Sequence, residues 1–134
     1  MKILFVTKFY PPVEGGIERY SHTLCTAVRQ RGVEIEVVAA AGETRSSSVE
    51  EVEGVKVHRL GLLATLRRAP VTPRLPALLR ELAPRFDLVH HNFPNPWAEL
   101  CQLAAGRGTR SLVTYHSDIF RQKLLLLLYR PWIH

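Results

Sequence analysis

The sequence contains too little cysteine for a disulfide-stabilised fold or for a cysteine-based metal or redox centre. Only two of the 134 residues are cysteine, Cys25 and Cys101, and their separation matches no CxxC spacing. Both lie in stretches whose apolar residues recur at helical spacing. We therefore predict two buried thiols in a reducing compartment, which indicates a cytoplasmic protein.

Long apolar segments are also absent from the sequence. The amino-terminal run in MKILFVTKFYPP is too short for the apolar part of a secretory signal peptide. The longest later run, Leu124–Leu128, falls well short of the roughly 20 residues that a membrane-spanning helix needs. We expect no membrane span.

The positive charge of the chain comes without the motifs of nucleic-acid binding. Lys and Arg total 18 against 12 Asp and Glu, giving a formal charge of +6. Such a balance suits an anionic partner, such as nucleotide phosphates or an acidic membrane surface. RNA-recognition, zinc-finger and basic-zipper signatures are absent from the sequence, so we expect no nucleic-acid partner.

Strand-like and helix-like segments alternate along the chain. Strand-forming runs lie at 2–7, 33–42, 55–60, 86–91 and 110–116, and residues 43–54 form a polar connection. Helical spacing occupies 16–32, 72–85 (with Thr72 as N-cap and Pro73 at the first helical position), 95–108 and 117–134. The alternation predicts one α/β domain over residues 1–134, a Rossmann-like doubly wound parallel sheet with three α/β/α layers.

Unusual loop chemistry follows the first predicted strand, in the segment KFYPPVEGGIERY. A glycine pair that enters a helix leaves backbone N–H groups open at the positive end of the helix dipole, an arrangement typical of phosphate binding. The pair fits neither GxGxxG nor a P-loop. A turn that simply requires positive φ is the alternative explanation.

Histidines follow two other predicted strands. His116 and Asp118 come after the fifth strand, where a histidine can donate to a phosphate or sugar hydroxyl and titrate near neutrality. Helix capping or a surface position is the alternative for both. His90 and His91 are adjacent, hence on opposite faces of a strand, so we expect no shared metal site. Because ligands bind outside the carboxyl ends of parallel strands, these segments predict a common crevice.

Three segments together, FYPPVEGGIERYSHTLCTAVRQRGVEIEVVAA, DLVHHNFPNPWAEL and LVTYHSDIFRQKLLLLLYRP, resemble the amino-terminal domain of family 4 glycosyltransferases of GT-B architecture. The similarity runs from Lys2 to Pro131 and is greatest to bacterial polysaccharide mannosyltransferases. It implies retaining, metal-independent transfer of a hexose, mannose favoured, from a nucleoside diphosphate sugar to a saccharide or lipid-linked acceptor. No cofactor is implied beyond that donor substrate.

The resemblance also assigns roles to individual residues. Gly15 and Gly16, with Glu14 beside them, would meet the donor diphosphate and face the acceptor, and their amides would stabilise the leaving diphosphate. His116 matches the cleft histidine that approaches the transferred sugar and phosphate, and Asp118 would orient it or touch the acceptor. Candidate acceptor contacts are Asn92, Asn95, Arg121 and Lys123, although a solvated helix face explains the last two equally well.

Family 4 members continue into a second Rossmann-like domain that carries most of the nucleotide site, whereas this chain stops at His134. We therefore expect an incomplete amino-terminal domain that transfers no sugar by itself. The run Leu124–Leu128 would surround a helix with leucine, which predicts a homodimer contact or binding to an anionic membrane surface at the inner face. The alternative function is a non-catalytic Rossmann-like binding module for an anionic ligand or protein partner.

Overall fold

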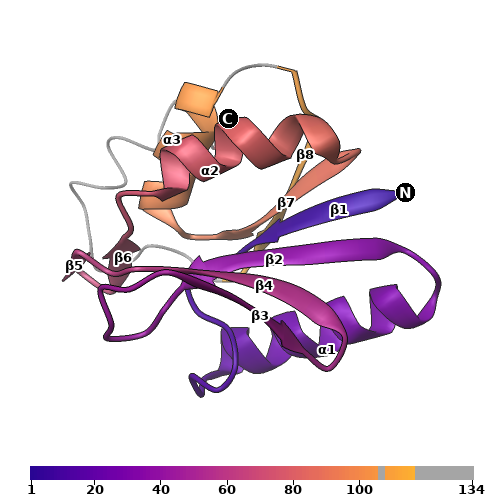
Figure 1. The fold of residues 1–134 in the computed structure, drawn as a ribbon, viewed down its shortest axis with the longest axis horizontal. Coiled ribbons are helices and arrows are strands. Elements are labelled where there is room, and N and C mark those ends of the chain that lie inside the picture. The colour runs from indigo at the N-terminus through magenta and orange to yellow at the C-terminus, as the bar shows by residue number, and fades with distance from the viewer. Residues whose placement is uncertain (106–107, 117–134) are drawn as a thin grey trace.

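Six strands form one sheet in the part of the chain that the computed structural model describes, residues 1–105 and 108–116. The strand order is β3-β4-β2-β1-β7-β8 (Figure 1). Five strands are parallel: β1 (Lys2–Val6), β2 (Glu34–Ala40), β4 (Val55–Leu60), β7 (Leu88–Phe93) and β8 (Ser111–Tyr115). Their order is that of a Rossmann fold, so the prediction of a Rossmann-like parallel sheet is confirmed.

Helices cover both faces of the sheet, which confirms the three predicted layers. Helix α1 (Gly16–Gln30) lies on one face, and α2 (Leu75–Leu82), the 3-10 turn η1 (Ala83–Arg85) and α3 (Pro96–Ala105) lie on the other (Figure 1). Since strand side chains alternate between faces, Phe5 and Val37 belong to the α1 core, whereas Leu4 and Val38 belong to the α2 and α3 core.

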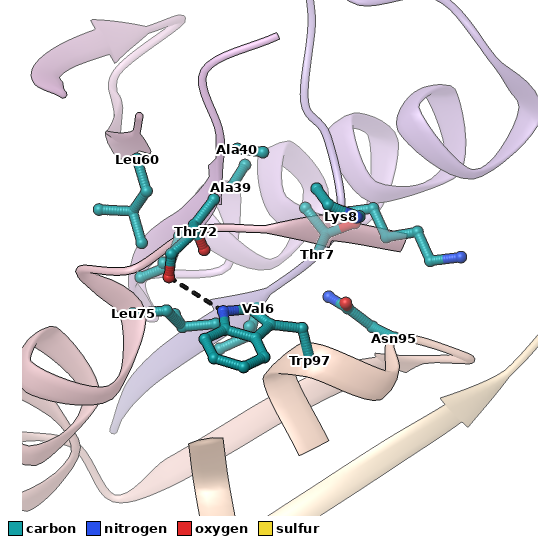
Figure 2. Close-up of a pocket in the computed structure, with 12 residues that line it drawn as sticks. Val6, Thr7, Lys8, Ala39, Ala40, Leu60, Thr72, Leu75, Asn95 and Trp97 are labelled. Carbon is teal, nitrogen blue, oxygen red and sulfur yellow. Dashed lines mark hydrogen bonds between the residues drawn. The ribbon is translucent and has the colours of Figure 1, made fainter. Parts of the chain in front are cut away.

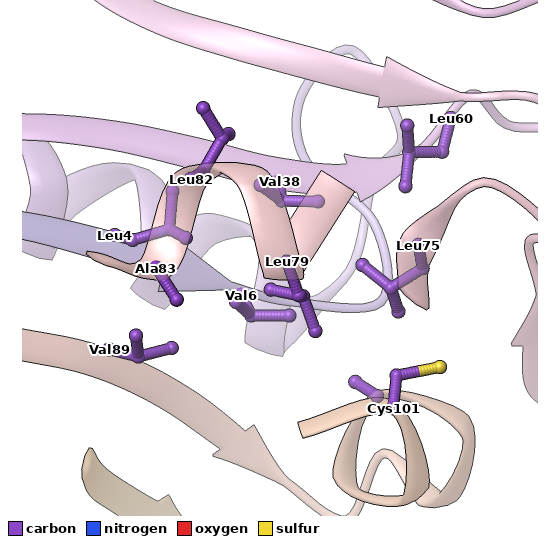
Figure 3. Close-up of a cluster of buried hydrophobic side chains, with 11 residues drawn as sticks. Leu4, Val6, Val38, Leu60, Leu75, Leu79, Leu82, Ala83, Val89 and Cys101 are labelled. Carbon is purple, nitrogen blue, oxygen red and sulfur yellow. The ribbon is translucent and has the colours of Figure 1, made fainter. Parts of the chain in front are cut away.

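The α2 side of the core depends on a leucine stripe. Leu75, Leu79 and Leu82 recur at helical spacing and share one buried cluster with Val6 and Val89 of the sheet (Figure 3). The two cysteines divide between the cores, Cys25 on the α1 side and Cys101 on the α3 side. Both thiols are free and buried, as predicted.

An edge strand occupies the segment predicted to be a polar connection. β3 (Ser48–Val52) pairs antiparallel with β4 through a tight turn in which Glu53 and Gly54 have φ of 48° and 79°. The polar connection predicted at 43–54 therefore contains a strand that was not predicted. Most of β3 is exposed, so the strand needs no apolar face. Backbone pairing with β4 stabilises it, and its polar composition therefore gave no indication of a strand.

A second hairpin joins β4 to α2. β5 (Ala64–Leu66) and β6 (Ala69–Val71) pair antiparallel, and the two residues between them, Arg67 and Arg68, have φ of 48° and 68°. Arginine is an unusual residue for this left-handed conformation, which Asn and Gly normally occupy in hairpin turns. The composition of the turn gave no hairpin signal, and neither strand was predicted.

Helix α2 begins later than its predicted start. The helix starts at Leu75, so Pro76 lies in its first turn, where a missing N–H costs nothing. The predicted N-cap Thr72 instead closes a preceding turn, its carbonyl accepting from the backbone N–H of Leu75 at 3.1 Å.

None of the helices in the described residues is long and apolar enough to cross a membrane. The helix predicted at 117–134, with its run Leu124–Leu128, lies outside those residues.

Candidate functional site

The glycine pair starts helix α1 at the carboxyl end of β1. Gly15 is the N-cap and has an extended backbone with φ of 171°, and Gly16 is the first helical residue. Neither glycine is among the positive-φ residues, so backbone conformation does not explain the pair. A Cβ added to Gly16 would meet no atom within 4 Å. The helix start is therefore exposed backbone, and its first N–H groups have no partner within the helix.

Two carboxylates share this helix start. Glu14 is exposed immediately before the glycines, and Glu18 lies in the first turn of α1, where negative charge is favourable. The Glu18 carboxylate folds over Gly15 so closely that a Cβ there would collide with it. A bound anion would have to displace Glu18 or share the helix dipole with it.

The loop that leads to the glycines is held by Arg59 of β4, whose side chain is only 7% exposed. Its Nη1 donates to the carbonyl of Tyr10 at 2.9 Å, and its Nη2 donates to the carbonyl of Pro11. Its Nε also donates to Glu50 Oε1 of β3 at 2.7 Å. The guanidinium thus anchors the start of the proline-rich segment to the sheet.

Asn92, near the end of β7, is the centre of a buried hydrogen-bond network. Its Nδ2 donates to Thr7 Oγ1 at 3.2 Å and to Ser21 Oγ at 2.7 Å. Its Oδ1 lies 3.0 Å from Nε2 of His116. Three segments distant in sequence, the ends of β1 and β8 and the second turn of α1, therefore meet at one amide.

His116 lies directly after β8, and its backbone N–H donates to the carbonyl of Phe93 at 3.2 Å. Its ring meets the ring of Tyr20 edge to face, with centroids 4.8 Å apart and planes at 79°. Burial lowers the pKa of His116 from its ordinary value, which favours a neutral ring near pH 7. The structure thus brings this histidine against the helix that begins at Gly16.

A small hollow opens at the carboxyl ends of β1 and β2, on the α3 side of the sheet (Figure 2). Lys8, Asn95 and Trp97 lie on its wall, and the indole N–H of Trp97 donates to the carbonyl of Thr72 at 2.9 Å. Burial lowers the pKa of Lys8, opposed by the nearby carboxylate of Glu99. The Asn95 side chain is buried, and its Oδ1 has no hydrogen-bond partner among the described residues.

The predicted acceptor contacts therefore differ in availability. Asn92 has its amide engaged by Thr7, Ser21 and His116, whereas Asn95 lines the hollow with a buried oxygen that has no hydrogen-bond partner among the described residues. Asp118, Arg121 and Lys123 lie outside the described residues, so their predicted roles stay predictions.

His90 and His91 occupy opposite faces of β7, as predicted from their adjacency. His90 lies 4.8 Å from Phe5, ring centroid to ring centroid, and its Nε2 is 2.7 Å from Thr114 Oγ1. His91 lies on the other face near Gln102, where burial lowers its pKa to about 4. Within the described ranges, no three His, Cys, Asp or Glu side chains gather as a metal site would require.

Several residues around the site were not identified from the sequence. Tyr20 could be assigned to the apolar positions of the predicted helix, and Ser21 is the small polar residue next to it. Neither residue type indicated a contact with the site. Thr7 is the last residue of the predicted strand 2–7, and nothing in the sequence indicated a role for it. Arg59 gave no signal, because its partners are backbone carbonyls of a distant loop.

The strand order, and a helix that starts on bare backbone at the carboxyl edge of the sheet, define a Rossmann-like α/β domain with a candidate ligand site at that edge. Residues 14–134 match the family model of Glycosyltransferase Family 4. The chain therefore belongs to glycosyltransferase family 4.

Two characterised bacterial relatives are similar over nearly the whole chain. D-rhamnosyltransferase WbpZ of Pseudomonas aeruginosa is 35% identical over 132 residues, which cover 98% of this chain and 34% of the relative. O-antigen chain mannosyltransferase C of Escherichia coli is 33% identical over 135 residues, covering 98% of this chain and 35% of the relative. The chain thus spans about a third of the length of these relatives.

Among solved structures, sucrose-phosphate synthase from Thermosynechococcus elongatus has a similar fold. The TM-score is 0.56 at 18% sequence identity, and the match covers 92% of this chain and 36% of the synthase chain. At this identity the likeness supports the fold of the domain.

Proposed function

We propose that the protein transfers a hexose, with mannose favoured, from a nucleoside diphosphate sugar to a saccharide or lipid-linked acceptor. The transfer retains the anomeric configuration and needs no metal. The chain supplies the acceptor-side domain, with Gly15 and Gly16 facing the donor diphosphate and His116 facing the transferred sugar. Family membership and the names of both bacterial relatives support glycosyl transfer. The name of one of them, a mannosyltransferase, supports mannose, whereas the other is named a D-rhamnosyltransferase.

The observation that carries the proposal is the contact between Tyr20 and His116. Tyr20 lies one turn into the helix that starts at Gly16, and its ring packs 4.8 Å from the imidazole, centroid to centroid. The open helix start and the histidine therefore flank one edge of the sheet. N–H groups at a helix start suit the leaving diphosphate, and an imidazole suits a sugar hydroxyl.

A donor screen with the protein as expressed from its natural gene tests this function. Guanosine, uridine and thymidine diphosphate sugars are compared by calorimetry and by transfer to saccharide acceptors, with and without EDTA. We expect one donor to bind and be consumed, transfer to persist in EDTA, and the product to keep the donor's anomeric configuration by NMR. Binding of nucleotide sugars without transfer to any acceptor would favour the non-catalytic binding module.

The hollow on the α3 side is the candidate place for the acceptor. Asn95 Oδ1 is buried and has no partner among the described residues, so a hydroxyl group that reached it would meet a free acceptor, and Lys8 on the same wall adds a donor. Asn95→Leu removes the acceptor at nearly the same volume, and we expect it to raise KM for the acceptor while leaving donor binding unchanged. An unaltered KM for the acceptor would remove Asn95 from this role.

A lipid surface with anionic head groups is the proposed partner near this edge, with the protein at the inner face of the membrane. The β5–β6 hairpin exposes Leu63 and Leu66, at 58% and 65%, next to Arg67 and Arg68 at its tip. Exposed leucines beside arginines suit the boundary between acyl chains and acidic head groups. Pro70 of the same hairpin lines the hollow, so docking here would bring a lipid-linked acceptor close to it.

Vesicle cosedimentation tests this partner. We expect binding to vesicles that contain phosphatidylglycerol, little binding to pure phosphatidylcholine, and a several-fold loss in the double variant Arg67→Ala, Arg68→Ala. The double variant Arg31→Ala, Arg80→Ala removes the same charge from two exposed positions on other elements and serves as the control. Equal loss in both double variants would mean that overall charge, and not the hairpin, determines binding.

A further inference from the structure

We propose that Asn92 is a positioning residue that fixes both the tautomer and the ring orientation of His116. The sequence suggested Asn92 as an acceptor contact, yet its side chain is only marginally accessible, with the residue 2% exposed. Thr7 and Ser21 accept from one end of its amide, and His116 lies at the other end. Asn92 therefore acts on the site through the histidine.

The direction of the amide follows from a chain of single protons that begins at a backbone carbonyl. Ser21 Oγ donates to the carbonyl of Ile17 at 2.7 Å, as a carbonyl can only accept. A serine hydroxyl has one proton, so Ser21 Oγ must accept in its second bond, at 2.7 Å from Asn92. The NH₂ end of Asn92 therefore points toward Ser21 and Thr7.

The opposite end of the amide determines the protonation of His116. With Nδ2 directed at two hydroxyls, the oxygen Oδ1 faces the imidazole, 3.0 Å from Nε2. An amide oxygen only accepts, so Nε2 of His116 must carry a proton. In the neutral ring Nδ1 then holds a lone pair, and no described residue is a hydrogen-bond partner for it. The nitrogen left for a ligand is Nδ1, as an acceptor.

The network also fixes where the ring lies. Tyr20 packs on the imidazole edge to face, and the backbone N–H of His116 is tied to Phe93. Tyr20, Ser21 and Ile17 all belong to the first two turns of α1. The glycine start of α1 and the imidazole of His116 are therefore held in one arrangement by one helix. Such preorganisation is what a site needs before a ligand arrives.

NMR of the natural full-length protein labelled with ¹⁵N-histidine tests the inference. In the wild type we expect His116 as a single Nε2–H tautomer whose ring proton exchanges slowly with water. Asn92→Asp keeps an oxygen at this position and adds negative charge, so the pKa of His116 should rise by about one unit, a tenfold change in proton affinity. Asn92→Ala should make the Nε2 proton exchange at least tenfold faster.

His90 is the internal control, because its Nε2 bonds to Thr114 and has no contact with Asn92. Its tautomer and the exchange of its ring proton should stay unchanged in Asn92→Ala and should change in Thr114→Val. The titration of His90 is not part of the control, because burial and the charge of His116 both lower the pKa of His90. If Asn92→Ala does not fold, Ser21→Ala gives a milder version of the same loss and should also speed exchange of the His116 ring proton. An Nδ1–H tautomer in the wild type, or an unchanged His116 pKa in Asn92→Asp, would overturn the inference.

The consequence for transfer rests on the proposed function, and its test is separate. In an active enzyme, Asn92→Ala should lower kcat about tenfold and change the KM of the donor less than twofold, since the residue touches no substrate. A roughly tenfold rise in the KM of the donor with unchanged kcat would contradict the role of Asn92 as a positioning residue. NMR results as expected together with no transfer to any acceptor would leave the tautomer inference standing and remove the proposed function.

Discussion

The side chains of Ser21 and Asn92 are joined by a hydrogen bond of 2.7 Å, although 71 positions separate them in sequence. Ser21 belongs to the helix that follows the first strand, and Asn92 belongs to β7, across the point where the strand order reverses. The bond therefore joins α1 to β7 at the carboxyl edge of the sheet, where ligands bind in folds of this kind. Geometry at the glycine loop and at His116 is therefore coupled through the fold.

Gly16→Ala should separate function from stability. A Cβ at this position would meet no atom within 4 Å, and alanine favours a helix by up to about 1 kcal/mol over glycine. We expect a melting temperature equal to or slightly above the wild type, with donor affinity reduced several-fold because the methyl group covers the helix start. Thermal melts and calorimetry measure the two effects.

Gly108→Ala is the matched control for that experiment, because its added Cβ also meets nothing within 4 Å. It should leave donor affinity unchanged. The bulkier Gly16→Val should weaken donor binding further. A Gly16→Ala variant that binds donor as well as the wild type would show that the bare helix start has no part in recognition.

Arg59→Met should destabilise the protein and release the loop before the glycines. The substitution leaves the carbonyls of Tyr10 and Pro11 without their donors and Glu50 without its partner. We expect a loss of about 3 kcal/mol in the free energy of unfolding. Urea denaturation measures it, and hydrogen exchange should rise most in residues 10–16. Arg80→Met, at an exposed position on α2, should cost far less.

Acid should weaken the fold through His91. Its pKa is lowered by burial from 6.5 to about 4, so above pH 6.5 the ring is neutral in both folded and unfolded states. Below that pH the unfolded chain takes up the proton first, and stability therefore falls as the pH drops from about 6.5 to about 4. Over this pH range His91 alone should lower the free energy of unfolding by about 3 kcal/mol.

Urea melts between pH 8 and pH 4 measure this acid dependence. His91→Leu should flatten the curve, while the lowered pKa values of His90 and His116 leave a residual slope. Identical slopes in wild type and His91→Leu would exclude His91 as the origin.

The two thiols should be inert in the native state. Burial raises the pKa of Cys25 to about 12 and that of Cys101 to about 11, so little thiolate forms at pH 8. Alkylation with iodoacetamide, followed by peptide mass spectrometry, should modify both only after addition of denaturant. Labelling of either peptide in native protein at the rate of free cysteine would contradict this.

Four of the five parallel strands could be predicted because each contains an apolar run that is largely buried on both faces, as in 3–6 and 37–40. β8 is mostly exposed and was predicted from its strand-forming composition alone. The two hairpins could not be predicted in the same way. β3 is stabilised by backbone pairing to β4 while its side chains point to water. The turn at Arg67 and Arg68 lacks the asparagine or glycine that marks such turns. Local composition is a weak guide where tertiary pairing decides the conformation.

The candidate site was predictable only in part. Gly15, Gly16 and His116 could be located because each directly adjoins a predicted strand or helix. Thr7, Ser21 and Asn92 could be assigned to elements, but not to one another. Their bonding depends on the strand order, which places β7 beside β1 and turns the inner face of α1 toward both.

The double-arginine tip of the β5–β6 hairpin has a consequence for engineering this protein. Each left-handed arginine costs roughly 1 kcal/mol relative to a residue that adopts this conformation readily, so Arg67→Asn with Arg68→Gly should raise the melting temperature. A thermostability selection, or a consensus redesign that favours Asn-Gly turns, would therefore tend to erase both charges. Libraries made from this scaffold should keep 67 and 68 fixed until vesicle binding has been measured.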